Sequence, residues 1–149
     1  MVHALDEIRR ILVPNGILID LRPILDNWHI EVISARERRE TGRIQDLPFG
    51  LADDKAANQS IAQAEQNGWL TREAEEFFPF YYSWDSPSEM EEWVKEEWRD
   101  FIQLDEESKQ VTRSAWALGE ADSRVRVKVK MLITRWRVAT PALKDASQR

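Results

Sequence analysis

The chain has 149 residues, of which 42% are apolar and 32% charged, and its formal net charge is −6. This length and composition suit a single domain over residues 1–149 and exclude a disordered protein. The absence of cysteine excludes disulfides, thiolate metal sites and thiol nucleophiles, and His3 and His29 are too few for a zinc site or a catalytic triad. No apolar run approaches the roughly 20 residues of a membrane span and no apolar signal core is present, so we expect a cytoplasmic protein.

The first predicted elements are a helix over residues 3–13 and a strand over residues 17–21. Apolar residues recur on one face of the helix, and Pro14-Asn15-Gly16 ends it. Residues 17–21 are nearly continuously apolar, which is typical of a strand covered on both faces, and Pro23 is predicted to end this strand. A long hairpin is expected next, with strands at residues 28–33 and 41–47 joined by a charged turn.

The middle of the chain is predicted to form a helix over residues 53–67, capped by Gly68, and then an aromatic strand. Pro79 cannot donate to a strand ladder, so this strand is expected at an edge or with a bulge. Its aromatic side chains fall into two rows, Phe78, Phe80, Tyr82 and Trp84 on one side and Phe77 and Tyr81 on the other.

Two further helices and a last strand are predicted. Ser86, Pro87 and Glu89 are typical of a helix start with a capping box. The helix that follows is expected to bury one face, made of Met90, Trp93, Val94, Glu97 and Phe101. The next helix spans residues 105–118 and ends at Gly119. The last strand spans residues 124–138, alternates strictly up to Met131, and then carries apolar groups on both faces.

Charge is unevenly distributed along the chain. Residues 85–107 hold ten acidic and two basic residues, a net of −8, whereas residues 108–149 hold ten basic and three acidic residues, a net of +7. The two blocks can neutralise each other within one chain or across a dimer. The polar tail, residues 141–149, is expected to be frayed.

The segment ALDEIRRILVPNGILIDLRP, residues 4–23, resembles the region up to and including the fifth strand of class I S-adenosylmethionine-dependent methyltransferases. Those enzymes often carry Glu-Ile-Arg-Arg on a helix there, then a Pro-Gly-Gly-like turn and an apolar strand; Asn15 and Val13 depart from that pattern. The resemblance implies an α+β fold with a mixed, largely antiparallel sheet, like the C-terminal half of a Rossmann-like methyltransferase. Residues 132–138 would then run antiparallel beside residues 17–21, and residues 124–130 would pair with the hairpin.

In that family the preceding half binds the cofactor, through a Gly-rich turn and an acidic residue that holds the ribose. The five glycines of this chain form no such motif. The resemblance therefore implies a partial domain without the cofactor-binding half. No cofactor is expected for the isolated chain, and S-adenosylmethionine is expected only if a partner supplies the missing half.

No set of residues forms a catalytic constellation, and no metal site is predicted. The small-molecule candidates are Asp20 and Arg22 at the end of the buried strand, His29, and the aromatic residues Tyr82 and Trp84. A basic row on the last strand, Arg124, Arg126, Lys128 and Lys130, could follow a phosphate backbone. The acidic block nearby favours a solvated face paired with the acidic helices, so nucleic-acid binding is not expected.

Three functions stay open. The leading hypothesis is a non-catalytic methyltransferase-like domain that acts through dimerisation or through binding a partner or ligand. The second is the substrate-side half of a split methyltransferase with a methyltransferase-type partner, and the third is nucleic-acid binding. The chain is not expected to be an active enzyme alone. A homodimer is expected, because it would cover the edge of residues 17–21 that a fourth strand covers in the family.

Overall fold

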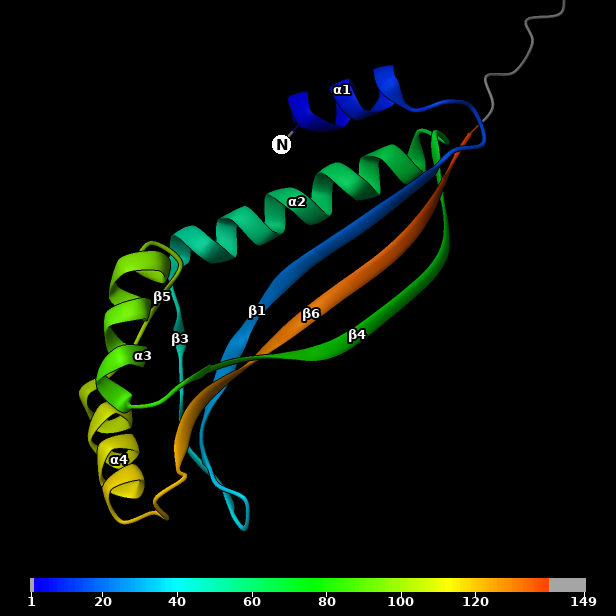
Figure 1. Cartoon of the computed structure of the whole chain (residues 1–149). Coiled ribbons are helices and arrows are strands. Elements are labelled where there is room, and N and C mark those ends of the chain that lie inside the picture. The colour runs from blue at the N-terminus through cyan, green and yellow to red at the C-terminus, as the bar shows by residue number, and fades with distance from the viewer. Residues whose placement is uncertain (1, 140–149) are drawn as a thin grey trace, which may run out of the picture. The chain divides into compact units, whose positions relative to one another are not determined.

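The computed structural model describes residues 2–139 (Figure 1), so the tail predicted to be frayed lies outside the described residues. The elements, in chain order, are α1 (Val2–Ile11), β1 (Ile17–Ile33), β2 (Arg38–Arg43), β3 (Gln45–Asp46), α2 (Pro48–Gln66), β4 (Leu70–Trp84), α3 (Pro87–Trp93), the π-helical segment η1 (Val94–Trp98), β5 (Ile102–Gln103), α4 (Glu106–Ala117) and β6 (Arg124–Val138). The predicted α+β class is confirmed.

Four strands form the main sheet in the order β2-β1-β6-β4, and β3 pairs with β5 in a small second sheet. Strands β1 and β2 are antiparallel, with His29 opposite Arg43 and Ile33 opposite Arg38. Strand β6 lies between β1 and β4 (Figure 1). It runs antiparallel to β1, because Val138 N–H donates to the Gly16 carbonyl near the start of β1, whereas Arg126 contacts Glu31 near its end. The predicted pairing of the last strand with the first is therefore confirmed.

The prediction that Pro23 ends the first strand is wrong, because β1 continues through it for 17 residues. Strand β2 pairs only with residues 29–33 of β1, so Pro23 lies on a free edge, where a missing N–H costs no ladder hydrogen bond. Further along this edge, carboxylates accept hydrogen bonds from the backbone amides. Leu25 N–H donates to Asp54 (2.9 Å), and Asn27 N–H donates to Asp46 (3.0 Å).

Other element boundaries follow the sequence prediction to different degrees. Strand β6 has the predicted bounds, Asp105 caps α4, and Gly68 has φ +70° after α2, as expected of a helix end. Helix α2 begins five residues earlier than predicted, at Pro48, and β4 begins at Leu70. The predicted strand at residues 41–47 is divided between β2 and β3.

The chain folds as two compact units, and each is described by itself. Among the described residues, unit 1 consists of residues 2–21, 56–76 and 133–139. Its core packs Ala64 of α2 against Leu70, Trp136 and Val138 of the strands. Leu12, Leu18, Ile61 and Trp69 complete this core.

Unit 2 consists of residues 22–55 and 77–132. Its core contains Met90 and Val94 from the helical segment α3–η1, together with residues of β1 and β6: Trp28, Ile30, Val32, Val125, Val127 and Val129. Helix α4 packs closely on β2, since a Cβ added to Gly42 would lie 2.4 Å from the Ser108 hydroxyl. In this unit, helical segments therefore pack on strands β1, β2 and β6 and bury one face of them.

The predicted buried face of the third helix is only partly correct. Met90 and Val94 are buried, but Trp93 and Phe101 are exposed. The helix continues as η1, whose wider turns shift the residues that follow. Trp98, not Glu97, packs against the core as a result.

Met90 gives a direct test of the unit 2 core. Its side chain is fully buried (0% exposed), so Met90→Ala leaves a cavity and is expected to lower the free energy of unfolding by about 2–5 kcal/mol. Urea unfolding measures this change. Leu118→Ala is the control, because Leu118 is 85% exposed and should change stability by less than about 0.5 kcal/mol. Equal effects of the two substitutions would contradict this core.

Candidate functional site

The basic row of β6 lies on the side of the strand opposite the unit 2 core. Val125, Val127 and Val129 are buried in that core, so the alternating cations face the other way. Three of the four have carboxylate partners: Arg124 contacts Asp85 (2.6 Å), Arg126 contacts Glu31 (2.6 Å) and Lys130 contacts Asp26 (2.9 Å). Lys128 makes no ion pair with any residue that the structure describes.

Two aromatic rings of β4 flank these cations. The Arg126 guanidinium lies 4.2 Å from the centre of the Tyr81 ring, and the Lys130 ammonium lies 5.1 Å from the centre of the Phe77 ring. Both are cation–π geometries. The predicted division of aromatic side chains between two faces of β4 is thus confirmed for Phe77 and Tyr81, which face the basic row.

The partners of the basic row differ from the prediction. Acidic helices were expected to neutralise it, but Glu31 and Asp26 come from β1, and Asp85 precedes α3. The acidic helical residue Glu91 pairs instead with Arg113 of α4. A stripe whose cations already have carboxylate partners has little charge left for a phosphate backbone.

A cavity of about 300 Å³ opens beside the basic row, within unit 2. It is lined by Asp26, Trp28 and His29 of β1, Phe77, Phe78 and Pro79 of β4, and Lys128, Val129 and Lys130 of β6. His29 Nδ1 lies 2.8 Å from a Glu40 carboxylate oxygen. The hydrogen bond from His29 holds the pKa of the Glu40 carboxyl below its ordinary value. The structure therefore brings His29 together with Lys128 and Lys130, which the sequence did not group.

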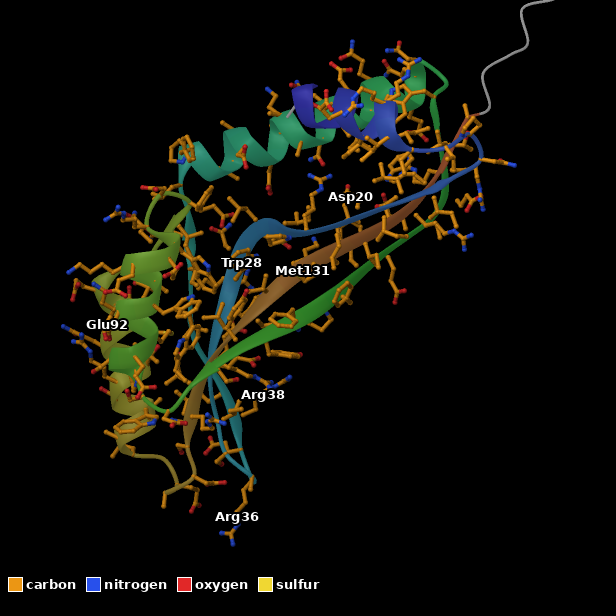
Figure 2. The ribbon with its side chains drawn as sticks, turned by 45° about the horizontal axis from the view of Figure 1, so that its top comes forward. Asp20, Trp28, Arg36, Arg38, Glu92 and Met131 are labelled. Atoms are coloured by element: carbon orange, nitrogen blue, oxygen red, sulfur yellow. The ribbon has the colours of Figure 1, made fainter. Side chains whose placement is uncertain are left out.

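The aromatic candidates Tyr82 and Trp84 lie elsewhere. Both pack against the unit 2 core, in a cluster with Trp93 and Trp98 whose ring centroids are 5.0–6.5 Å apart. Trp28 belongs to the same core (labelled in Figure 2), and its ring meets Trp98 edge-on at 5.5 Å. The rings of Tyr82 and Trp84 are therefore engaged in packing and do not line the cavity.

Asp20 and Arg22 do not lie at the end of a strand, which was the reason for predicting a ligand site there. They lie within the first half of β1, because the strand continues through Pro23. Both side chains are half-buried and each interacts with a neighbouring group. Figure 2 labels Asp20 on β1, whereas Arg36 and Arg38 lie at the β1–β2 hairpin.

The first part of β1 forms a second distinctive surface, within unit 1. Ile17, Ile19 and Leu21 are 45%, 50% and 55% exposed, while Leu18 between them packs into the unit 1 core. Gly16 accepts from Val138 N–H and so faces β6. Because strand residues alternate in direction, the amides of residues 17, 19 and 21 point to the opposite edge, where no described strand pairs with them.

Sequence reasoning missed the cavity because its lining comes from three strands. The aromatic pattern of Phe77 and Phe78 is compatible with a ligand pocket but favours packing, and no pattern singles out Asp26. Asn27, between the lining residues Asp26 and Trp28, adopts the left-handed conformation (φ 46°), which asparagine tolerates better than most residues; no pattern within one segment indicates the cavity itself.

The ion pair between Arg126 and Glu31 should be structural. Their side chains are 19% and 6% exposed, so Arg126→Gln leaves a buried carboxylate without its closest cation and is expected to cost about 3 kcal/mol of unfolding free energy. Adding Glu31→Gln should recover most of that loss in urea unfolding. Arg124→Gln is the matched control, because its pair with Asp85 is exposed and should contribute less than about 1 kcal/mol. A single-variant loss no larger than the control's would contradict this role.

Within residues 2–139, no group of three or more histidine or acidic side chains could hold a metal ion. None of the helices in this range has the length and apolar character needed to cross a membrane. Comparisons of the chain with protein-family models, curated proteins and solved structures find no match. The two surfaces that distinguish the described residues are the cavity of unit 2 and the free edge of unit 1.

Proposed function

We propose that the chain is a non-catalytic, methyltransferase-like domain that works by pairing with a second copy of itself through β1 of unit 1. The observation that carries this proposal is the free edge at residues 17–23, where Ile17, Ile19 and Leu21 expose about half of their surface. An edge strand with apolar side chains and unpaired backbone groups is a template for pairing with another strand.

The other edges of the four-stranded sheet are protected in ways that prevent such pairing. The outer edge strand β4 contains Pro79 and a charged stretch over residues 72–76. Strand β2 at the opposite end carries four charged residues in six. Later in β1, Asp54 and Asp46 accept hydrogen bonds from the edge amides of Leu25 and Asn27, respectively. Residues 17–21 carry one charge, Asp20, and its backbone faces β6, not the edge.

The free edge is also self-complementary. An antiparallel pairing centred on Ile19 places Ile19 opposite Ile19 of the second copy and Ile17 opposite Leu21, so apolar side chains meet across a twofold axis. The same register ends at Pro23, which has no amide hydrogen to donate, and at the Pro14-Asn15-Gly16 turn. Fully burying side chains of this kind is worth roughly 1.5–3 kcal/mol each, so covering three half-exposed ones favours the dimer.

Sedimentation at low micromolar concentration should therefore give a mass near twice the monomer. Ile19→Lys places two like charges opposite each other at the twofold axis and is expected to yield monomers. Leu118→Lys is the control, since Leu118 is equally apolar and more exposed but lies outside the proposed interface. A folded wild-type monomer, or a dimer that survives Ile19→Lys, would contradict the proposal.

The register can be tested separately, because the chain contains no cysteine. Under mild oxidation Ile19→Cys should form an intermolecular disulfide, since opposite Cβ atoms of an antiparallel pair lie about 4.5–5.5 Å apart. Leu118→Cys should form none at the same protein concentration. Equal cross-linking of the two variants would reject the twofold axis at Ile19.

A second candidate function is the substrate-side half of a split methyltransferase. It is supported by the strand order β1-β6-β4, which places the last strand beside the first, as the resemblance implies. A partner half would then occupy the free edge of β1 in place of the second copy.

Titration of the isolated chain with S-adenosylmethionine tests the absence of a cofactor site in both candidate functions. No binding is expected up to about 1 mM ligand, because the chain holds no Gly-rich turn to approach the cofactor backbone. Isothermal titration calorimetry provides the measurement. Micromolar binding would show that the chain carries a cofactor site of its own.

A further inference from the structure

We propose that the cavity of unit 2 beside β6 binds a small molecule made of a flat aromatic ring with one anionic group, a phosphate or a carboxylate. The cavity measures about 300 Å³, which lies at the small end of the range for ligand sites. The proposal is independent of self-association, because the lining residues all belong to unit 2.

The charges of the lining favour a single anion. The Lys130 ammonium pairs with an Asp26 carboxylate oxygen at 2.9 Å. His29 Nδ1 lies 2.8 Å from a Glu40 carboxylate oxygen. Lys128 is the lining cation for which the described residues provide no carboxylate. An ammonium on a long flexible side chain can turn toward an anion in the cavity and form a charge-assisted hydrogen bond with it.

The apolar part of the lining favours a ring. Phe77 is 52% exposed, and its ring, together with Phe78 and Pro79, lines the cavity on the β4 side. The Lys130 ammonium lies 5.1 Å from the centre of the Phe77 ring, which helps to hold that ring in place. Aromatic rings prefer offset-stacked or edge-on contacts with another ring, and an exposed phenylalanine can provide either.

A polyanion fits this surface less well than a small anion. The carboxylates Asp26, Glu31 and Asp85 already neutralise the neighbouring cations, so a phosphate backbone would have to displace them. One anionic group needs only Lys128. A second cavity, of about 580 Å³, is lined by both acidic and basic residues, among them Glu91 and Lys95, and by no aromatic ring, so it lacks this pairing of ring and cation.

Phenyl phosphate is the probe, compared with inorganic phosphate and with phenol in isothermal titration calorimetry on the full chain. We expect phenyl phosphate to bind with a Kd of about 1 mM or tighter, and each fragment about tenfold more weakly. Lys128→Gln and Phe77→Leu should each weaken phenyl phosphate by about tenfold, through loss of the charge-assisted contact or of the ring contact. Lys95→Gln makes the same charge change in the other cavity and should leave binding unchanged.

A readout on the wild-type chain removes any dependence on how the variants fold. The Trp28 indole N–H donates to the Ile24 carbonyl (2.8 Å) and Trp28 lines the cavity. Its proton–nitrogen resonance should therefore shift as phenyl phosphate is added. Absence of binding at about 10 mM, inorganic phosphate binding as tightly as phenyl phosphate, an unaltered Kd in folded Lys128→Gln, or an unmoved Trp28 resonance would each overturn the proposal.

Discussion

The central strand β6 constrains the rest of the chain, because its two edges are both paired and its buried side chains enter both cores. Val125, Val127 and Val129 belong to the unit 2 core, whereas Trp136 and Val138 belong to the unit 1 core. The first row is odd-numbered and the second even-numbered, so the alternation shifts by one residue between them, where Lys130 and Met131 are both half-buried. Because side chains alternate along a strand, the even-numbered cations up to Lys130 point away from the unit 2 core, and the odd-numbered Arg135 and Arg137 point away from the unit 1 core.

Local patterns predicted the elements well, and failed where a long-range neighbour decides. Alternation of apolar residues predicts the bounds of β6, and a capping residue predicts the start of α4. Pro79 predicts the edge position of β4. Each of these signals lies within a short stretch of sequence. The sequence predicts a strand end at Pro23, because it does not show which edge of β1 lacks a partner. The apolar groups on both faces after Met131 were interpreted as a covered strand. In the structure the buried positions change from odd to even numbers there, and Arg135 is exposed.

The candidate site was harder to predict than the fold. The basic row was visible in the sequence, but its partners Asp26 and Glu31 are 104 and 95 residues away. The charges of neighbouring residues in the sequence indicate the acidic helices as partners instead. In the structure, Glu91 of α3 pairs with Arg113 of α4. The proposed ligand chemistry therefore depends on the residues that the ion pairs leave available, Lys128 beside Phe77 and Phe78. Which residues are left available depends on strand order and on register, and local spacing in the sequence encodes neither.

The two open surfaces differ in how they meet water. In unit 2, the side of β6 away from the core carries ion pairs and cation–π contacts, which suit a strand face left in solvent. In unit 1, Leu18 packs inward while Ile17, Ile19 and Leu21 expose about half of their surface, so this part of the strand presents apolar side chains to solvent. Replacing those three residues by polar ones would keep the inward packing intact, because alternation separates the two faces. The exposed apolar surface at these positions is the observation on which the proposed association with another chain rests.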